Sequence, residues 1–262
     1  MHVHFFKLDF PFDRGFARFP FMVDGLPFPG ISCAISHRGC GDMRYAPNVD
    51  NPNRRRFFAS LNIGLGRVYA RVQTHSRDVS VAGEASDRPG DGLVAADQSS
   101  VLSMTVADCL PVFLLDPDRR VFALLHSGWK GTGIVSAALS LMSKRWGSNP
   151  EAVTAILGPC IRSCCYVVDE ARAAAFQAEF GTTGGAVSSS LPLGPVVRRE
   201  GGRAFLDLQA ANARLLAAAG IRDLAVCEDC TYTDERLGSF RREGDRFTRM
   251  VAVVGRLPEE TQ

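Results

Sequence analysis

Short apolar runs bounded by turn residues recur through the middle of the chain. Each run is rich in β-branched or other apolar residues and is too short for a helix, so each predicts a strand. A polar turn at residues 116–120 separates the second run from the third and predicts a hairpin. The three runs are residues 101–107, 112–115 and 121–125.

The ends of these central strands carry reactive side chains. The first strand is expected to end at Asp108 and Cys109, because the missing amide hydrogen of Pro111 disfavours a central strand position. His126 would finish the hairpin. A glycine-rich turn containing Lys130 follows and leads into a helix, so backbone amides and a cation are expected beside both reactive residues.

The remaining elements alternate between helices and strands. Helices are predicted at 54–61, 134–146, 169–180 and 207–219, and further strands at 31–35, 68–72, 153–157, 224–227 and 249–254. The alternation, with hairpins mixed in, predicts an α+β fold in which mixed β-sheets are covered by helices in a layered sandwich. A single domain over residues 1–262 is expected.

Two polar segments are expected to be loops. Residues 77–92 should form a surface loop marked by Asp87, Pro89 and Asp91, and residues 181–202 a mobile loop. The basic run from Arg54 to Arg56 is expected on a solvated helix face.

Composition narrows the class of protein. Of 262 residues, 46% are hydrophobic and 22% charged, as in soluble globular proteins. The net charge of +2 gives no reason to expect nucleic acid as a partner, and no apolar stretch is long enough to span a bilayer. The eight cysteines are expected to be reduced thiols in the cytoplasm, because the chain shows no export signal. The oligomeric state stays open.

His75, Cys109 and His126 are expected at the ends of three strands. Two imidazoles and one thiolate can hold zinc tetrahedrally with the fourth position open, as catalytic zinc requires. Their separations of 34 and 17 residues are not those of a zinc finger, so the fold must bring them together. Two other interpretations stay open: ordinary packing residues, or a Cys109 nucleophile with His126 as base and Asp108 as orienting group.

An ordered set of motifs resembles the laccase-domain family, which is also called multicopper polyphenol oxidase-like or peptidoglycan editing factor. The resemblance covers roughly residues 30 to 255. The matching segments are 73–75 (QTH), 105–112 (TVADCLPV), 126–131 (HSGWKG), 157–159 (LGP), 164–166 (CCY), 230–232 (CTY) and 239–242 (SFRR).

This resemblance implies a zinc-dependent purine nucleoside enzyme. It would phosphorolyse adenosine, inosine or methylthioadenosine and deaminate adenosine, with small-molecule nucleoside and phosphate as its partners. The metal ligands would be His75, Cys109 and His126. Copper is the alternative ion, although five histidines in all are few for a multicopper oxidase.

Other residues receive expected roles beside the metal. Asp108 could orient a ligand histidine, move a proton or merely cap a turn. Candidate contacts to substrate or phosphate are Arg38, Gln73, Lys130 and Arg241, and Phe240 and Tyr232 could stack on a purine. A second, structural zinc site formed by Cys227, Cys230, Cys160 and Cys164 is a less favoured interpretation.

The chain departs from the family pattern at a few positions. Ser76 replaces a glycine, Ser127 an alanine and Val167 a glutamate, and residues 39–41 replace the usual N-terminal loop. These changes are expected to affect substrate choice more than metal binding. Further alternatives are a hydrolase that edits peptidoglycan precursors, a copper-dependent phenol oxidase and a non-catalytic interaction protein.

Overall fold

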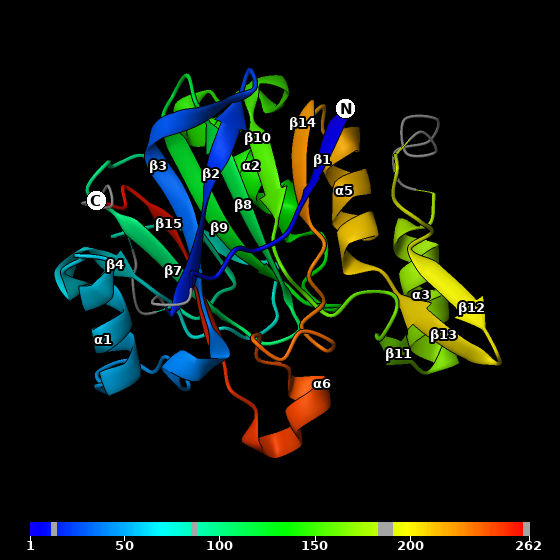
Figure 1. Ribbon diagram of the computed structural model, residues 1–262. Helices are drawn as coiled ribbons and strands as arrows, with labels where there is room; N and C mark the ends of the chain where they lie inside the picture. Colours follow the sequence, from blue (N-terminus) through cyan, green and yellow to red (C-terminus); the bar gives the residue numbers. More distant parts are fainter. Residues whose placement is uncertain (12–14, 85–87, 183–190, 259–262) are drawn as a thin grey trace.

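Two mixed β-sheets packed face to face form the centre of the molecule (Figure 1). The computed structural model describes residues 1–11, 15–84, 88–182 and 191–258. In the larger sheet the strand order is β1 (His2–Phe6), β14 (Asp223–Cys227), β10 (Thr154–Leu157), β8 (Leu110–Asp116), β9 (Val121–Ser127), β6 (Gly92–Ala95) and β5 (Val79–Val81).

The other described strands form two further sheets. The second central sheet has the order β2 (Phe16–Val23), β3 (Leu26–Ser36), β15 (Met250–Gly255), β7 (Val101–Val106) and β4 (Val68–Tyr69). A small separate sheet has the order β11 (Val167–Val168), β13 (Arg203–Leu206) and β12 (Val197–Glu200), beside α3 in Figure 1.

Helices cover the outer faces of both central sheets. They are α1 (Pro52–Ser60), α2 (Ile134–Trp146) and α5 (Leu208–Ala218). The helix α3 (Glu170–Phe180) lies beside the small sheet, and the short α6 (Phe240–Glu243) lies at one end of the sandwich (Figure 1). Short 3-10 turns are η1 (Arg38–Cys40), η2 (Leu65–Arg67), η3 (Pro150–Ala152) and η4 (Gly244–Arg246). Residues of α2 and α5 pack on the larger sheet, those of α3 on α5 and the small sheet, and those of α1 on the smaller central sheet, which confirms the predicted α+β sandwich in a single domain.

The β8–β9 hairpin joins the two halves of the core. Val112 and Leu114 of β8 point into the cluster under the helices, whereas Phe113 and Leu115 point into the cluster between the sheets. Both faces are therefore buried, and this explains why the hairpin is almost continuously apolar instead of alternating.

Pro111 corrects one expectation, because it lies inside β8, paired with His126. A residue's N–H and C=O point to the same neighbouring strand. The carbonyl of Pro111 accepts a 2.9 Å hydrogen bond from the amide of Gly158, just beyond the end of β10. The missing N–H therefore faces a position past the last residue of β10, where no ladder hydrogen bond is lost. Cys109 thus lies directly before β8 and not at the end of β7.

The two predicted loops contain more structure than expected. The first, residues 77–92, includes β5 and the fully buried Asp91, while residues 85–87, with the expected marker Asp87, lie outside the described part. The second includes β12, while residues 183–190 lie outside the described part. Both segments are largely polar in sequence, and short strands such as these place few side chains in the core, Val79 and Val197 among them, so they leave little apolar signal.

Arg54 is a further correction, because only 7% of it is exposed. Its guanidinium donates hydrogen bonds to the Met43 carbonyl and the Ser103 hydroxyl, at 3.2 and 2.7 Å. It also lies over the rings of Tyr45 and Phe58. These contacts satisfy a buried cation, so Arg54 anchors α1 in the core, whereas Arg55 and Arg56 lie on the solvated face as expected.

Among the residues that the structure describes, no helix combines the length and the apolar character needed to cross a membrane.

Replacing Phe113 should test the packing between the sheets. Phe113 is fully buried and contacts the Phe19 ring edge-on, with 5.4 Å between ring centroids. Phe113→Ala is expected to lower the free energy of unfolding by about 3–5 kcal/mol, as core truncations of this size do. Phe5→Ala, at a ring that is 41% exposed, serves as the control and should cost much less. Equal losses in urea denaturation would contradict this account.

Candidate metal centre and pocket

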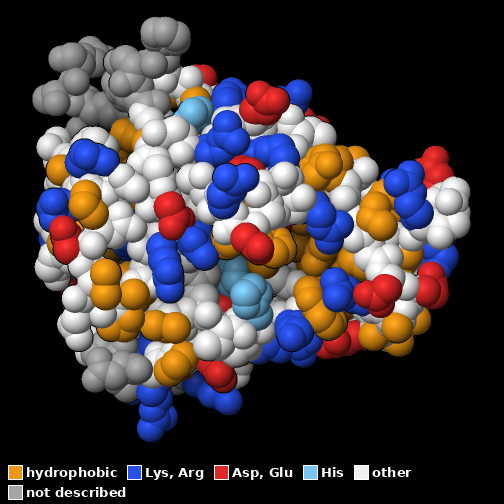
Figure 2. Space-filling model, turned by 90° about the horizontal axis from the view of Figure 1, so that it is seen from below, with side chains coloured by type: hydrophobic (Ala, Val, Ile, Leu, Met, Phe, Trp, Pro, Cys, Tyr) orange, Lys and Arg blue, Asp and Glu red, His pale blue; other side chains and the backbone are white. Residues whose placement is uncertain are grey.

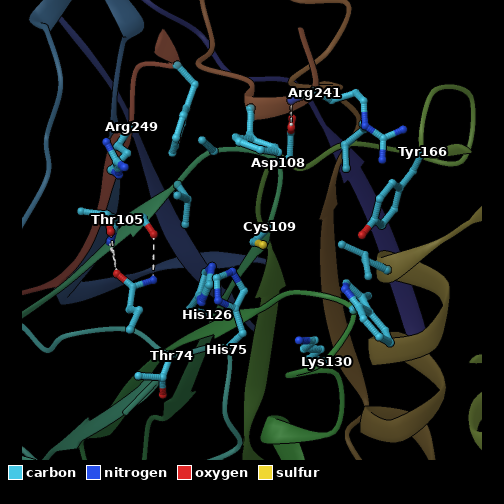
Figure 3. Close-up of a pocket in the computed structure, with 18 of the residues that line it drawn as sticks. Thr74, His75, Thr105, Asp108, Cys109, His126, Lys130, Tyr166, Arg241 and Arg249 are labelled. Atoms are coloured by element: carbon cyan, nitrogen blue, oxygen red, sulfur yellow. Dashed lines mark hydrogen bonds between the residues drawn. The ribbon is translucent and has the colours of Figure 1, made fainter. Parts of the chain in front are cut away.

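The fold brings His75, Cys109 and His126 together (Figure 3). One nitrogen from each imidazole and the cysteine sulfur all lie within 4.8 Å of one another. The two imidazole rings meet edge to face, with centroids 5.0 Å apart. The three residues can therefore share one metal ion.

Two connections between the sheets supply two of these side chains. Cys109 lies in the short link from β7 in the smaller sheet to β8 in the larger one, and His75 lies in the segment that leads from β4 to β5 across the same gap. His126 lies near the end of β9. Residues far apart in sequence meet because both crossings occur at the same end of the sandwich.

The backbone at the site includes two uncommon conformations. His75 has φ 60° and Asp108 has φ 77°, in the left-handed region that non-glycine residues rarely adopt. Such conformations persist where surrounding contacts hold them, and they cluster at functional sites.

Asp91 provides those contacts for His75. From the sequence, Asp91 was expected only as the marker of a surface loop, so its part in the site was missed. Its carboxylate accepts hydrogen bonds from the backbone amides of Thr74, His75 and Ser76 at 2.7 to 3.0 Å. It also bonds Nδ1 of His126 at 2.8 Å. The second nitrogen of His126, Nε2, is left as the metal-binding atom, the usual arrangement of a carboxylate behind a ligand histidine.

Electrostatics prepare the thiol for metal binding. Burial raises the pKa of Cys109, but the charge and hydrogen bond of His126, with those of His75, outweigh burial and lower this pKa to about 6. Burial lowers the pKa of His126, yet Cys109 and Asp91 raise it to about 9. The pKa of Asp91 is held far below its usual range by its hydrogen bonds and by His126, despite burial. Without metal, the site therefore contains a thiolate beside an imidazolium near neutral pH.

Of the roles expected for Asp108, its contacts fit the cap of a turn, and a part in proton transfer stays a prediction. Its two oxygens accept hydrogen bonds from the Thr231 hydroxyl at 2.6 Å and from the backbone amide of Arg241 at 2.7 Å. The second bond reaches the first turn of α6, so the capping role is the one its contacts support. The group that orients His126 is Asp91.

Gln73 is also held by protein contacts. Its side chain exchanges hydrogen bonds with the backbone of Thr105, at 2.8 Å in each direction, and accepts another from the Thr105 hydroxyl at 2.6 Å. It joins the segment before His75 to the end of β7, and its contact to substrate stays a prediction.

The metal-ligand group opens into a cavity of about 620 Å³, within the usual range for small-molecule sites. In Figure 2 pale-blue histidine side chains lie in a hollow near the centre of the face, with basic, apolar and some acidic side chains around it. Eight apolar or aromatic residues line the cavity: Val106, Ala107, Trp129, Ile161, Tyr166, Leu208, Phe240 and Phe247.

Four cations line the same cavity: Lys130, Arg172, Arg241 and Arg249. Arg249 pairs with Asp42 at 3.1 Å and Arg172 with Asp169 at 3.6 Å. Among the described residues, no carboxylate forms an ion pair with Lys130 or Arg241, so these two charges face the cavity without an acidic partner. Sequence reasoning missed Arg172 and Arg249, which lie in helix and loop segments without a recognisable motif.

Arg38 lies apart from this group. It is not among the residues that line the cavity, and its guanidinium lies 3.6 Å from the carboxylate of Glu243. Its expected contact with phosphate stays a prediction without a geometric counterpart.

Comparison with known proteins identifies the family. A model of the family described as multi-copper polyphenol oxidoreductase laccase matches residues 39–257. The chain belongs to this family. It is 35% identical over 204 residues to a purine nucleoside phosphorylase of Deinococcus radiodurans, covering 78% of this chain and 76% of the relative. It is 29% identical over 192 residues to the adenosine deaminase RL5 from an unknown prokaryotic organism, covering 66% and 70% of the two chains.

A solved structure of the family shares the whole fold. The crystal structure of YlmD from Geobacillus stearothermophilus superposes with a TM-score of 0.79 at 27% identity, covering 96% of this chain and all of the other. YlmD itself is named a purine nucleoside phosphorylase and is 32% identical over 228 aligned residues.

The departures from the family motifs lie outside the cavity lining. The Ser76 hydroxyl donates to Asp91 at 2.9 Å, and the buried Ser127 hydroxyl donates to Asn212 of α5 at 3.2 Å. Val167 belongs to β11, and its carbonyl accepts from the guanidinium of Arg241 at 2.8 Å. Ser76 thus adds to the support of the ligand loop, and none of the three side chains lines the space where substrate would bind.

Gly128 leaves the room that the ligand side chains occupy. A Cβ at this position would lie 2.8 Å from the Cys109 sulfur and 3.2 Å from Cδ2 of His75. Contacts this short require the ligands to move, so the absence of a side chain at Gly128 is a condition of their geometry.

Asp91→Asn should weaken metal binding. The amide keeps the size of the carboxylate but loses the charge and part of the accepting capacity that hold His126 and residues 74–76. The affinity for zinc should fall by about 10–100-fold, as for other groups that support metal ligands. Competition with a chromophoric chelator measures this.

The control for this substitution is Asp116→Asn. Asp116 is also buried but lies at the opposite end of β8. It should leave zinc affinity unchanged, and an equal effect of both substitutions would refute the role given to Asp91.

Gly128→Ala should act on the same site through volume alone. The added methyl group displaces Cys109 or His75, so zinc affinity should fall by at least about tenfold, the lower end of the effect of losing ligand support. Gly66→Ala is the control, because a Cβ there meets nothing within 4 Å. Unchanged zinc affinity in Gly128→Ala would show that the ligands do not need this space.

Proposed function

We propose that this chain is a zinc-dependent purine nucleoside phosphorylase that acts on adenosine, inosine and methylthioadenosine and also deaminates adenosine. The observation that carries the proposal is an open set of three nitrogen and sulfur donors in a cavity lined by cations and aromatic rings. Relatives named purine nucleoside phosphorylase and adenosine deaminase support it.

The donor set fits zinc. Two imidazoles and one thiolate leave one position open for water or substrate. Asp91 leaves Nε2 of His126 as the donor, and the lowered pKa of Cys109 makes its thiolate available near neutral pH. When bound, zinc would lower the pKa of a water or polarise a substrate oxygen. Copper is the alternative ion, because imidazole and thiolate ligands also suit it.

The cavity cations suit phosphate. Phosphorolysis breaks the bond between ribose C1′ and the purine nitrogen, which leaves with the electron pair, and forms a bond from C1′ to a phosphate oxygen. Lys130 and Arg241 offer charges for that anion, since no acidic partner among the described residues competes for them. Asp108 contributes by holding the backbone of Arg241 and thereby positions this cation.

The aromatic side chains suit a purine. Phe240 lines the cavity and is 50% exposed, an unusual position for a large apolar ring. A flat base can cover such a ring by stacking. Tyr232 is 40% exposed but is not among the lining residues, so Phe240 is the preferred platform.

A cysteine-dependent hydrolase, acting for example on peptidoglycan precursors, is the second candidate. The observation that favours it is the order Cys109, His126, Asp91, in which a thiol meets an imidazole whose other nitrogen bonds a carboxylate. It gives no role to His75, which also contacts the thiol, whereas the metal site uses both histidines. We propose that the protein is located in the cytoplasm, where its own cysteines stay reduced, and this holds for either activity.

Turnover of adenosine tests both candidates. With phosphate, the protein should release adenine and ribose 1-phosphate, and inosine should appear with or without phosphate. Cys109→Ala should lose bound zinc and reduce both activities at least about a hundredfold, more than the loss of a supporting residue costs. Cys40→Ala, at a thiol outside the site, should keep both.

Two results would overturn this proposal. Full nucleoside turnover by metal-free protein would exclude the role of zinc. A covalent adduct on Cys109, detected by mass spectrometry together with activity that chelators do not change, would favour the cysteine hydrolase.

A further inference from the structure

Three cysteines outside the pocket form a second cluster. Cys164 and Cys165 follow β10, and Cys230 follows β14. Their sulfur atoms all lie within 4.8 Å of one another, with 3.3 Å between those of Cys164 and Cys165. The proposed nucleoside chemistry gives them no task.

We propose that Cys164, Cys165 and Cys230 form a second metal site, which binds one soft ion of the Cu(I) kind through three thiolates. This inference does not depend on the proposed enzymatic function. The cluster contains sulfur donors alone, with no imidazole or carboxylate in the group. Thiolates select soft ions, and three of them complete a trigonal Cu(I) site, whereas a structural zinc ion requires a fourth ligand.

The sulfur positions suit such an ion. Metal–sulfur bonds of about 2.3 Å place the sulfurs of a trigonal site about 4 Å apart. The sulfurs of Cys164 and Cys165 are 3.3 Å apart, and each lies no more than 4.8 Å from that of Cys230, so all three separations are close to this value. Small side-chain rotations are enough to reach it.

The backbone already holds the two loops together. Cys160 and Cys230 form a parallel bridge, and the amide of Thr231 donates to the Cys160 carbonyl at 3.1 Å. The amide of Arg162 lies 3.5 Å from the Cys230 sulfur, where it stabilises a thiolate. Cys164 is exposed, which gives an ion a route to the cluster.

This cluster differs from the four-cysteine zinc site considered from the sequence. The Cys227 sulfur points to Asp229 at 3.3 Å, and Cys160 is fully buried outside the group. Cys165, which was not among the four cysteines of that site, belongs to the cluster. Cys164 and Cys230 are thus common to both sets, and their loops meet through the Cys160–Cys230 bridge.

The cluster lies behind one wall of the pocket. Cys165 directly precedes Tyr166, which lines the cavity, and Cys230 directly precedes Thr231, which donates to Asp108. An ion bound by the three cysteines would cross-link the two loops that carry these residues.

Anaerobic Cu(I) binding under reducing conditions tests the site. Cu(I) is supplied as a complex with a competing chromophoric chelator, and the equivalents retained by the whole protein are counted. Cys164→Ser/Cys165→Ser should retain one equivalent fewer than the wild type. The matched control Cys40→Ser should retain the wild-type number, because that thiol lies outside both groups.

The Cys109→Ala background separates the second site from the first. It should still bind one Cu(I), and X-ray absorption should show three sulfur neighbours and no nitrogen. Bound Cu(I) should also slow alkylation of the exposed Cys164, which requires no substitution in the cluster. Equal retention by the double variant and Cys40→Ser, fewer than three sulfur neighbours, or unprotected Cys164 in Cu(I)-loaded protein would each overturn the proposal.

Discussion

The buried carboxylate of Asp91 is the interaction on which the candidate site depends. Removing a charge from water is costly unless hydrogen bonds and an opposite charge compensate. Three successive backbone amides, the Ser76 hydroxyl and the His126 imidazole provide that compensation. The same contacts hold His75 at its left-handed φ and select the free nitrogen of His126. One ionised group therefore determines the position of two of the three candidate metal-binding side chains.

The two-sheet architecture explains why residues so far apart in sequence meet. Cys109 and His75 lie on separate links between the sheets, and β9 supplies His126 from the central hairpin. The hairpin is buried on both faces, so its end can move little relative to either sheet. A rigid strand end combined with two short crossings gives a site whose geometry comes from the core rather than from a flexible loop.

The sequence predicted the apolar framework well, because the hairpin and α2 have strong periodic signals and clear turn residues. It also supplied the three donor residues by type. It missed Asp91, Arg54 and Cys165, whose surroundings come from tertiary contacts. A polar residue that bonds distant backbone amides looks like an exposed one in sequence, since its partners carry no side-chain pattern. Pro111 was misjudged for a related reason: the missing N–H matters only where a neighbouring strand continues.

Asp108 connects the metal-binding group to the cationic part of the pocket. It precedes Cys109 in the chain, and its left-handed backbone turns the carboxylate toward Thr231 and the first turn of α6. The donor sulfur and the backbone of Arg241 are thus joined through two adjacent residues. A displacement of the link between β7 and β8 must move the thiolate and the cation together. The spacing between the Cys109 sulfur and the backbone of Arg241 is therefore set by a short, doubly anchored segment, and such preorganisation would serve the proposed reaction between a metal-bound group and phosphate.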